Sequence, residues 1–277
     1  MKEQIALEPI SRDTCVVKGT NTQPGRTSWV KPAHTASRNL HYGRIRLNSE
    51  HPKVEFSTGG LETGLICLKG SGTVNVGGQH FAISPYDAIY IPRDSEVIVT
   101  TDAKIDLAEI GAPVEKQYPL QFVSFAAVRE NDSLHFVAGA PPTERDLNIL
   151  LGKNIEAGRI MAGVTFSSEG NWTSWPPHEH ENMLEEAYLY IDMPEPQWGI
   201  QLVYKDRSEP ELVQIVHEGD VVLMPQGYHP NVAAPGSHIN FLWMMAANRE
   251  GEDRQFGVVN VQPEYAAGGS GLEASQK

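Results

Sequence analysis

The sequence predicts an all-β protein built from two repeated halves, and three observations support this prediction. Short runs of alternating apolar and polar residues recur along the chain and end at glycines or prolines. The 277 residues include 25 glycines and 19 prolines, a turn-rich composition that suits many short strands better than long helices. The segment 87–96 also lines up with the segment 220–229, so the strand pattern of the first half returns in the second.

The predicted strands follow in chain order. The first half has them at 43–47, 63–69, 72–76, 87–92, 96–100 and 104–109, and the second at 159–166, 198–204, 213–216, 220–224 and 239–245. Strands at such intervals, broken by Gly and Pro, are typical of a β-sandwich or barrel. Residues 1–40 are polar and irregular, with 20–26 as a loop, and we expect them to lie over a barrel surface. Residues 143–148 are expected to connect the halves, and the residues after 262 to form a mobile tail.

Composition limits the classes of function. The formal net charge of -13 argues against nucleic acid or an anionic membrane as a partner, because either needs a basic face. A small anionic substrate is compatible with this charge if local Arg, Lys or metal charge overrides it. Cys15 and Cys67 lack paired spacing and are expected to be reduced thiols. No signal-like or membrane-spanning apolar run is present, so we expect a cytoplasmic protein.

One stretch has the spacing of metal ligands. His178 and His180 are two residues apart, so on an extended strand both imidazoles point to the same side. Glu185 or Glu186 follows after a turn, and His229 comes on a second apolar strand that ends in a Pro/Gly turn. Three imidazoles and a carboxylate suit a divalent ion such as Zn, Mn or Fe. The sequence therefore predicts one metal site, without identifying the ion.

These two segments resemble the two motifs of the cupin barrel, and several longer phrases resemble the 5-deoxyglucuronate isomerase family of inositol catabolism. The phrases lie at 170–180, 184–190, 201–208, 219–230 and 233–236. The motif spacing favours Glu185 as the carboxylate ligand, whereas strand register favours Glu186, which is in phase with Tyr188 and Tyr190. We therefore predict the ligand set as His178, His180, Glu186 and His229.

The resemblance implies a bicupin, that is, two tandem cupin barrels of the double-stranded β-helix, jelly-roll type. We expect a cupin-like domain without metal ligands over 1–140, a metal-binding cupin domain over 141–262 and the tail over 263–277. Glu96 stands where the repeat would need the counterpart of His229, and no His-x-His precedes Leu65. The metal is therefore expected only in the second half.

The same resemblance implies a metal-dependent aldose-ketose isomerase that converts 5-deoxyglucuronate to 5-dehydro-2-deoxygluconate in myo-inositol catabolism. The alternatives are the related 5-keto-4-deoxyuronate isomerase of pectin breakdown, an Fe-dependent cupin dioxygenase and a sugar sensor that lacks catalysis. Its partner would be a small sugar acid, and a homo-oligomer is compatible with the sequence. The candidate catalytic residues are Glu185, Tyr188 and Gln201, and the candidate substrate-binding residues are Arg159, Arg207 and Tyr190.

Overall fold

Strands make up nearly all the regular structure of the chain. The structure is a computed structural model, and it describes residues 5–273. Helical turns in this part of the chain are short: α1 (Arg12–Cys15), α2 (Phe125–Arg129) and the 3-10 helix η1 (Pro263–Gly268). None of them is long and apolar enough to cross a membrane. The all-β prediction is confirmed.

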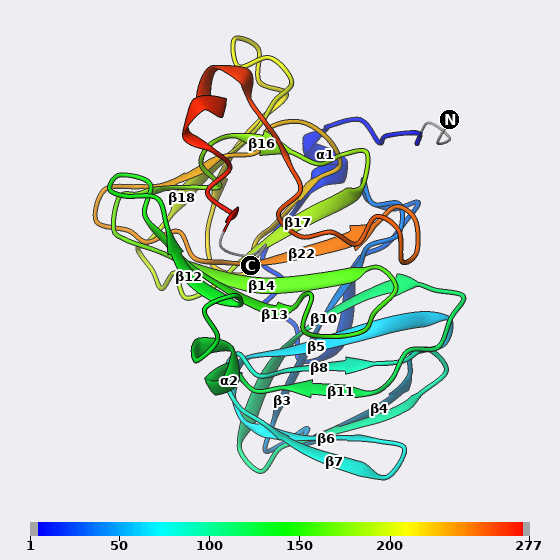
Figure 1. The fold of residues 1–277 in the computed structure, drawn as a ribbon. Helices are drawn as coiled ribbons and strands as arrows, with labels where there is room; N and C mark the ends of the chain where they lie inside the picture. Colours follow the sequence, from blue (N-terminus) through cyan, green and yellow to red (C-terminus); the bar gives the residue numbers. More distant parts are fainter. Residues whose placement is uncertain (1–4, 274–277) are drawn as a thin grey trace.

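The first half of the chain forms two antiparallel sheets (Figure 1). The six-stranded sheet has the order β11 (Gln121–Val123), β8 (Ala88–Ile91), β5 (Leu61–Gly70), β10 (Lys104–Pro113), β3 (His41–Asn48) and β2 (Gly25–Val30). The four-stranded sheet has the order β4 (Lys53–Ser57), β9 (Glu96–Thr100), β6 (Gly72–Val76) and β7 (Gln79–Ile83). Leu65 and Leu107 of the larger sheet join Val74 and Val99 of the smaller one in a shared apolar core, which holds the two sheets together.

The second half repeats this plan with a larger sheet, a four-stranded sheet and one extra strand pair. The seven-stranded sheet has the order β1 (Val16–Val17), β20 (Val221–Met224), β17 (Leu184–Tyr190), β22 (Phe241–Ala247), β14 (Ile160–Ser167), β13 (Arg145–Leu151) and β12 (His135–Ala138). The four-stranded sheet has the order β15 (Trp172–Thr173), β21 (Asn231–Ala233), β18 (Gly199–Val203) and β19 (Leu212–Val216). The strand pair joins β16 (His178–Glu179) to β23 (Asn260–Val261).

The sheets do not follow the predicted boundary at residue 140. Both β1 and β12 precede it in sequence, yet both pair within the sheet of the second half. Each sheet order is linear, so no sheet in the described part of the chain closes on itself. The division at 140 and the pair of closed barrels therefore stay predictions.

Two segments differ from the irregular structure expected of them. Residues 25–30 form the edge strand β2, because they alternate in exposure beside β3. Residues 145–148 begin β13, so most of the expected connection is strand. In the tail, Leu272 is 6% exposed, and η1 comes before it. The predicted mobility of 263–277 is not tested by these contacts, and residues 274–277 lie outside the described part.

Two buried glutamates connect the halves reciprocally. Glu185 of β17 accepts hydrogen bonds from the backbone N–H groups of residues 38–40, just before β3, at 2.5 to 2.7 Å. Glu62 of β5 accepts from those of residues 158–160, at the start of β14, at the same distances. We call these two groups of contacts the glutamate clasps. Each clasp fixes the start of one strand, β3 or β14, against the other half.

Candidate metal centre

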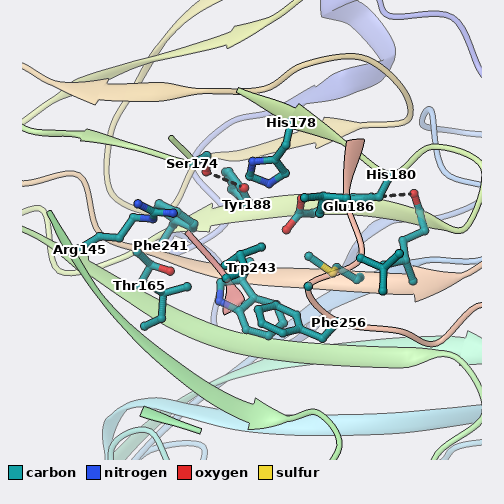
Figure 2. A pocket seen from close by; sticks show the side chains of 17 residues that line it. Arg145, Thr165, Ser174, His178, His180, Glu186, Tyr188, Phe241, Trp243 and Phe256 are labelled. Atoms are coloured by element: carbon teal, nitrogen blue, oxygen red, sulfur yellow. Dashed lines mark hydrogen bonds and ion pairs between the residues drawn. The ribbon is translucent and has the colours of Figure 1, made fainter. Parts of the chain in front are cut away.

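The two histidines of the His-x-His motif lie on β16, the strand that pairs with β23, and in the turn after it. This turn is closed by backbone N–H groups of Met183 and Leu184 that donate to the carbonyl oxygen of His180. The turn returns the chain to β17, where Glu186 lies opposite Met224 of β20. The path from β16 to β17 thus brings the histidines and the glutamate to one place, as Figure 2 shows.

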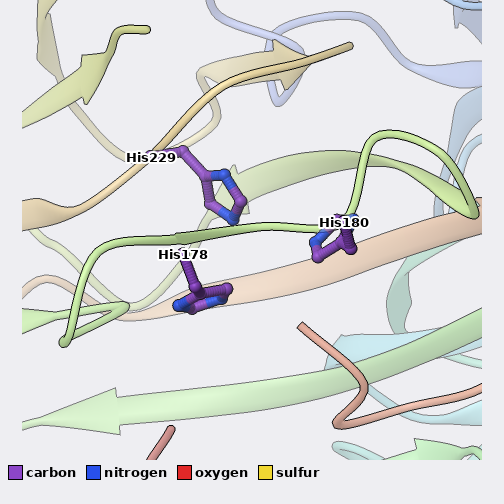
Figure 3. Close-up of side chains that lie close together, drawn as sticks. All are labelled: His178, His180 and His229. Atoms are coloured by element: carbon purple, nitrogen blue, oxygen red, sulfur yellow. The ribbon is translucent and has the colours of Figure 1, made fainter. Parts of the chain in front are cut away.

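The third histidine enters from the loop after β20. Gly227 has a positive φ of 84°, and a Cβ there would lie 2.8 Å from the carbonyl oxygen of Tyr204. Glycine is therefore required for the turn that precedes His229. The imidazole of His229 faces those of His178 and His180, with ring centroids 4.9 and 5.3 Å away (Figure 3).

Backbone carbonyl groups set the tautomer of all three histidines. The Nδ1 atoms of His178, His180 and His229 lie 2.9, 3.2 and 2.9 Å from the carbonyl oxygens of Pro176, Leu184 and Gly227. A carbonyl oxygen only accepts, so each Nδ1 carries the hydrogen and each Nε2 keeps a lone pair in the neutral ring. This arrangement is the one in which metal-binding histidines are usually held.

Glu186 completes the cluster. Its Oε2 lies 3.0 Å from Nε2 of His180 and 3.1 Å from Nε2 of His229. The three imidazoles offer ligand atoms within 4.8 Å of one another. All four side chains are at most 6% exposed. The structure thus brings Glu186, and not its neighbour, to the histidines, in agreement with the strand-register argument.

Burial and charge shift the pKa values in this cluster. Burial, together with the neighbouring imidazoles, lowers the pKa of His178 to about 3. Burial alone would raise the pKa of Glu186, but His180 and His229 lower it to about 2. Burial also lowers the pKa of His180, but the hydrogen bond that its Nε2–H donates to Glu186 and the charge of that carboxylate outweigh burial, so the net shift is upward. The carboxylate is therefore charged and needs a positive partner.

The residues fit a divalent metal ion. When the imidazoles of His180 and His229 are neutral, their Nε2 atoms, 3.0 to 3.1 Å from Oε2 of Glu186, and that oxygen are all acceptors, and a divalent ion would then take the place of the proton on His180. The Nε2 of His229 is buried and makes no hydrogen bond of acceptable geometry. Three nitrogens and one oxygen are the donor set of Zn, Mn and Fe sites. Within residues 5–273, no other group of three such side chains converges in this way.

A pocket opens beside the cluster between the strands of the seven-stranded sheet and the C-terminal segment (Figure 2). Tyr188 faces into it, and its hydroxyl lies 2.8 Å from the hydroxyl of Ser174. Trp243 of β22 stacks on Phe256, with ring centroids 4.9 Å apart. The lining residues are Arg145, Leu147, Thr165, Ser174, His178, His180, Leu184, Glu186, Tyr188, Phe241, Trp243, Met245, Phe256–Val259 and Leu272.

Three predicted residues lie outside this pocket. Glu185 points to the opposite face of β17, where the clasp uses both of its oxygens, so the expectation of a catalytic Glu185 is corrected by the alternation of the strand. Tyr190 donates a 2.6 Å hydrogen bond to Gln201. Gln201 in turn donates to the carbonyl oxygens of His229 and Pro230. Tyr190 and Gln201 therefore support the backbone of His229 from behind and do not face a ligand.

Neither predicted arginine reaches the pocket. Arg159 donates to the carbonyl oxygens of Pro113, Ala247 and Asn248, so its guanidinium joins backbone segments. Arg207 is exposed in the loop between β18 and β19. Both were predicted as cations for a sugar carboxylate, but Arg159 just before β14 is held by backbone carbonyl groups and Arg207 lies in an exposed loop.

Sequence reasoning missed Arg145, Trp243 and the C-terminal segment 256–259. Arg145 belongs to the stretch expected to be a connection. One signal was available, since Arg145 alternates with Leu147 and so faces the same side once β13 is a strand. No local signal marks 256–259, because those residues reach the pocket only when β23 pairs with β16.

The fold and the site define an all-β protein with a buried three-histidine, one-glutamate cluster at one end of a pocket. The family model described as the KduI/IolB family matches residues 15–262. The chain belongs to this family.

Two of the similar curated proteins carry the name 5-deoxy-glucuronate isomerase. The protein of Geobacillus thermodenitrificans is 33% identical over 171 residues, which cover 59% of this chain and 60% of that protein. The protein of Shouchella clausii is 28% identical over 205 residues, 68% of this chain and 73% of that protein. The chain thus spans about 60% of the length of the first of these relatives.

Solved structures share the fold at low sequence identity. An IolB-like protein from Salmonella typhimurium LT2 has a TM-score of 0.80 at 22% identity, covering 91% of this chain and 98% of that one. A variant of the oxalate decarboxylase of B. subtilis has a TM-score of 0.59 at 12% identity, covering 85% and 77%. These likenesses support an all-β fold of the cupin type.

Proposed function

We propose that this chain is a metal-dependent aldose-ketose isomerase that converts 5-deoxyglucuronate to 5-dehydro-2-deoxygluconate. The observation that carries the proposal is the convergence of His178, His180, Glu186 and His229 at one end of a pocket. Membership of the KduI/IolB family and the printed names of the relatives give the substrate. The reaction is an internal redox exchange, in which C1 is reduced and C2 is oxidised, so it needs no external oxidant.

We also propose that each half forms a cupin-type barrel and that only the second half holds the ion. Each half contains one larger sheet and one four-stranded sheet. The repeat aligns Ile91 with Met224, and the strand registers then place Thr63 at the position of Glu186. With Glu96 at the position of His229, the first half lacks both ligands at these positions.

Four side chains would hold the ion: His178, His180, Glu186 and His229. Bound there, a divalent ion supplies a Lewis acid that polarises the oxygens at C1 and C2 of the sugar. The chain's own part is to keep three Nε2 lone pairs directed inward through the backbone carbonyl groups. Gln201 holds the backbone at His229 in place.

Isomerisation moves a proton from C2 to C1 and another between the two oxygens. Tyr188 is the hydroxyl group beside the cluster, hydrogen-bonded to Ser174 and with its ring centroid 6.0 Å from that of His229. We propose that this hydroxyl pair holds the proton at a substrate oxygen. The apolar wall of Phe241, Trp243 and Phe256 excludes water from the reacting carbons.

Anaerobic turnover tests the function. The metal-loaded protein is incubated with 5-deoxyglucuronate without oxygen, and NMR follows the loss of the C1 aldehyde signal and the gain of a ketose carbonyl. Conversion without oxygen supports the isomerase and excludes the dioxygenase alternative. Turnover of 5-keto-4-deoxyuronate instead would assign the chain to pectin breakdown, and turnover of neither sugar acid would contradict the proposal.

The partner in this proposal is a small sugar acid, and the cytoplasm is the proposed compartment. Both cysteines are unpaired and buried, which is compatible with a reducing environment.

A further inference from the structure

Arg145 carries a buried positive charge that forms no ion pair with a carboxylate of residues 5–273. The residue is 3% exposed and lines the same pocket as the histidine cluster. Its Nη2 has no hydrogen-bond partner, and its Nη1 donates one long bond of 3.3 Å to the carbonyl oxygen of Thr143. Among residues 5–273 it makes no ion pair. Burial lowers its pKa to about 10, although Tyr188 and the carboxylate of Glu273 act to raise it, so the guanidinium is charged at neutral pH.

Among the described residues the one other fully buried arginine is paired, and the half-buried Arg38 leaves only its Nη1 without a partner. Arg44 is 2% exposed and forms a bidentate pair with Asp106, at 2.7 and 3.0 Å. Arg254 donates to three backbone carbonyl groups. A buried charge without a partner costs several kcal/mol of folding free energy. Within residues 5–273 no group fills this role, so an anion from outside the described part is the partner that the Nη2 of Arg145 fits.

Trp243 supplies a second free donor in the pocket. Its indole Nε1 is buried and has no hydrogen-bond partner. In Figure 2 this nitrogen and the hydroxyl of Thr165 lie on the Arg145 side of the pocket. Gly163 makes room for the indole, because a Cβ there would lie 2.2 Å from Cζ2 of Trp243. The Nη2 of Arg145 and the Nε1 of Trp243 are two unsatisfied donors in one pocket, and a ligand with two acceptor oxygens could bind both.

We propose that Arg145, assisted by the indole N–H of Trp243, binds the carboxylate of the sugar acid and so fixes which end of the substrate faces the histidine cluster. The inference rests on the proposed function for the identity of the sugar and on the unpaired donors for the anion. A carboxylate has two oxygens that match the two-pronged guanidinium. The carbonyl end of an extended sugar acid then lies toward Glu186 and the histidines, on the other side of the pocket (Figure 2).

The test compares an acid with a neutral sugar that differs from it only at the last carbon. Turnover of 5-deoxyglucuronate and of 5-deoxyglucose is measured in the metal-loaded Arg145→Gln, Arg145→Lys and Arg46→Gln variants. Arg46 is the matched control, since it is a half-buried arginine of the first half, 3.4 Å from Asp106. Arg145→Gln is expected to raise KM for the acid about 30- to 1,000-fold, with little change in kcat and less than about threefold change in kcat/KM for the neutral sugar.

Arg145→Lys keeps the positive charge but lacks the two-pronged guanidinium, so its KM for the acid is expected to lie between those of the wild type and Arg145→Gln. Arg46→Gln should behave as the wild type. An equal loss for acid and neutral sugar would overturn the proposal in favour of a structural role for Arg145. Unchanged KM for the acid in Arg145→Gln, or no recovery in Arg145→Lys, would also overturn it.

A binding measurement separates this inference from the proposed function. Millimolar glucuronate should raise the Tm of the wild-type protein and glucose should not, because only a ligand of the folded state stabilises it. The Arg145→Gln variant should show no rise with glucuronate, and its own Tm without ligand should equal or exceed that of the wild type, since an unpaired charge is removed. This result without isomerase activity would leave Arg145 as an anion site and reject the isomerase. Isomerase activity with an unaltered glucuronate response in Arg145→Gln would reject the site alone.

Discussion

Glu185 and Glu186 are chain neighbours with unrelated tasks, because successive side chains of β17 point to opposite faces. Glu186 faces the imidazoles, and Glu185 faces the backbone of residues 38–40. Both are 2% exposed, so burial does not distinguish them. What distinguishes them is the kind of partner: imidazole nitrogens on one side and backbone N–H groups on the other.

The two glutamates should therefore respond differently to the same substitution. Glu186→Gln is expected to lower bound metal at least about tenfold, since a carboxylate ligand is lost. Glu185→Gln should keep the metal and lower the free energy of unfolding by about 1–3 kcal/mol, because a carboxamide cannot accept from all three N–H groups. Metal analysis and denaturant unfolding measure the two effects. Loss of metal in Glu185→Gln with full occupancy in Glu186→Gln would contradict the assignment.

The reactivity of Cys15 and Cys67 tests whether their thiols are buried in the folded protein. Desolvation raises the pKa of the Cys67 thiol to about 12 and also raises that of Cys15. A raised pKa leaves the thiol neutral at pH 8, with a thiolate fraction of about one in ten thousand for Cys67. Iodoacetamide at pH 8 should then label neither cysteine in the folded protein and both in denaturant, as mass spectrometry can count. Rapid labelling of the native protein would show that this part of the core opens.

At the scale of single elements, β14 and β22 depend on a glycine that lets an indole lie against the sheet. Gly163 pairs with Trp243 across the two strands, and a Cβ there would also lie 2.4 Å from the carbonyl oxygen of Asn148. Because a backbone atom is involved, the clash cannot be relieved by a rotamer change. The position of Trp243 in the pocket thus follows from the absence of a side chain on the neighbouring strand.

Gly163→Ala should lower the free energy of unfolding by about 1–3 kcal/mol and shift the tryptophan fluorescence as the indole moves. Gly268→Ala is the matched control, since a Cβ at that glycine meets nothing within 4 Å. Thermal unfolding and emission spectra compare the two. Wild-type stability in Gly163→Ala would show that β14 and β22 can separate without cost.

Sequence reasoning could find the histidine and glutamate cluster, and it could not find the residues at the other end of the pocket. His178, His180 and His229 are marked by local spacing, and strand alternation selects Glu186. Arg145 is informative because, within residues 5–273, its buried Nη2 has no hydrogen-bond partner, and no single segment of the sequence shows this. The edge strands and the segment after β22 were missed for a similar reason, since their pairing partners are distant in sequence.

For the whole molecule, the duplicated plan predicts an asymmetric metal content. The purified protein should hold about one divalent ion per chain, and His229→Ala should lose it, because only the second half combines three imidazoles and a carboxylate. Elemental analysis of both proteins measures this. Two tightly held ions, or one ion kept by His229→Ala, would place a site in the first half.

The glutamate clasps allow the duplicated plan to be tested by measuring the stability of the protein. Glu62→Gln is expected to lower the free energy of unfolding by about 1–3 kcal/mol, as Glu185→Gln does, although Glu62 lies in the half without ligands. Metal content should stay at the wild-type level. Denaturant unfolding with metal analysis gives both quantities, and a fully stable Glu62→Gln would mean that the clasp is dispensable.

The repeat aligns Glu62 with Glu185, and in each clasp one oxygen binds two N–H groups and the other binds one. Such exchange of identical contacts is the pattern of an isologous interface between two copies of one subunit. The two halves of this single chain therefore meet as the subunits of a twofold dimer do. This accounts for a first half that has no ligands at the aligned positions and still cannot be discarded. Without Glu62, the three N–H groups at the start of β14, the strand that brings Thr165 to the pocket, would lose their acceptor.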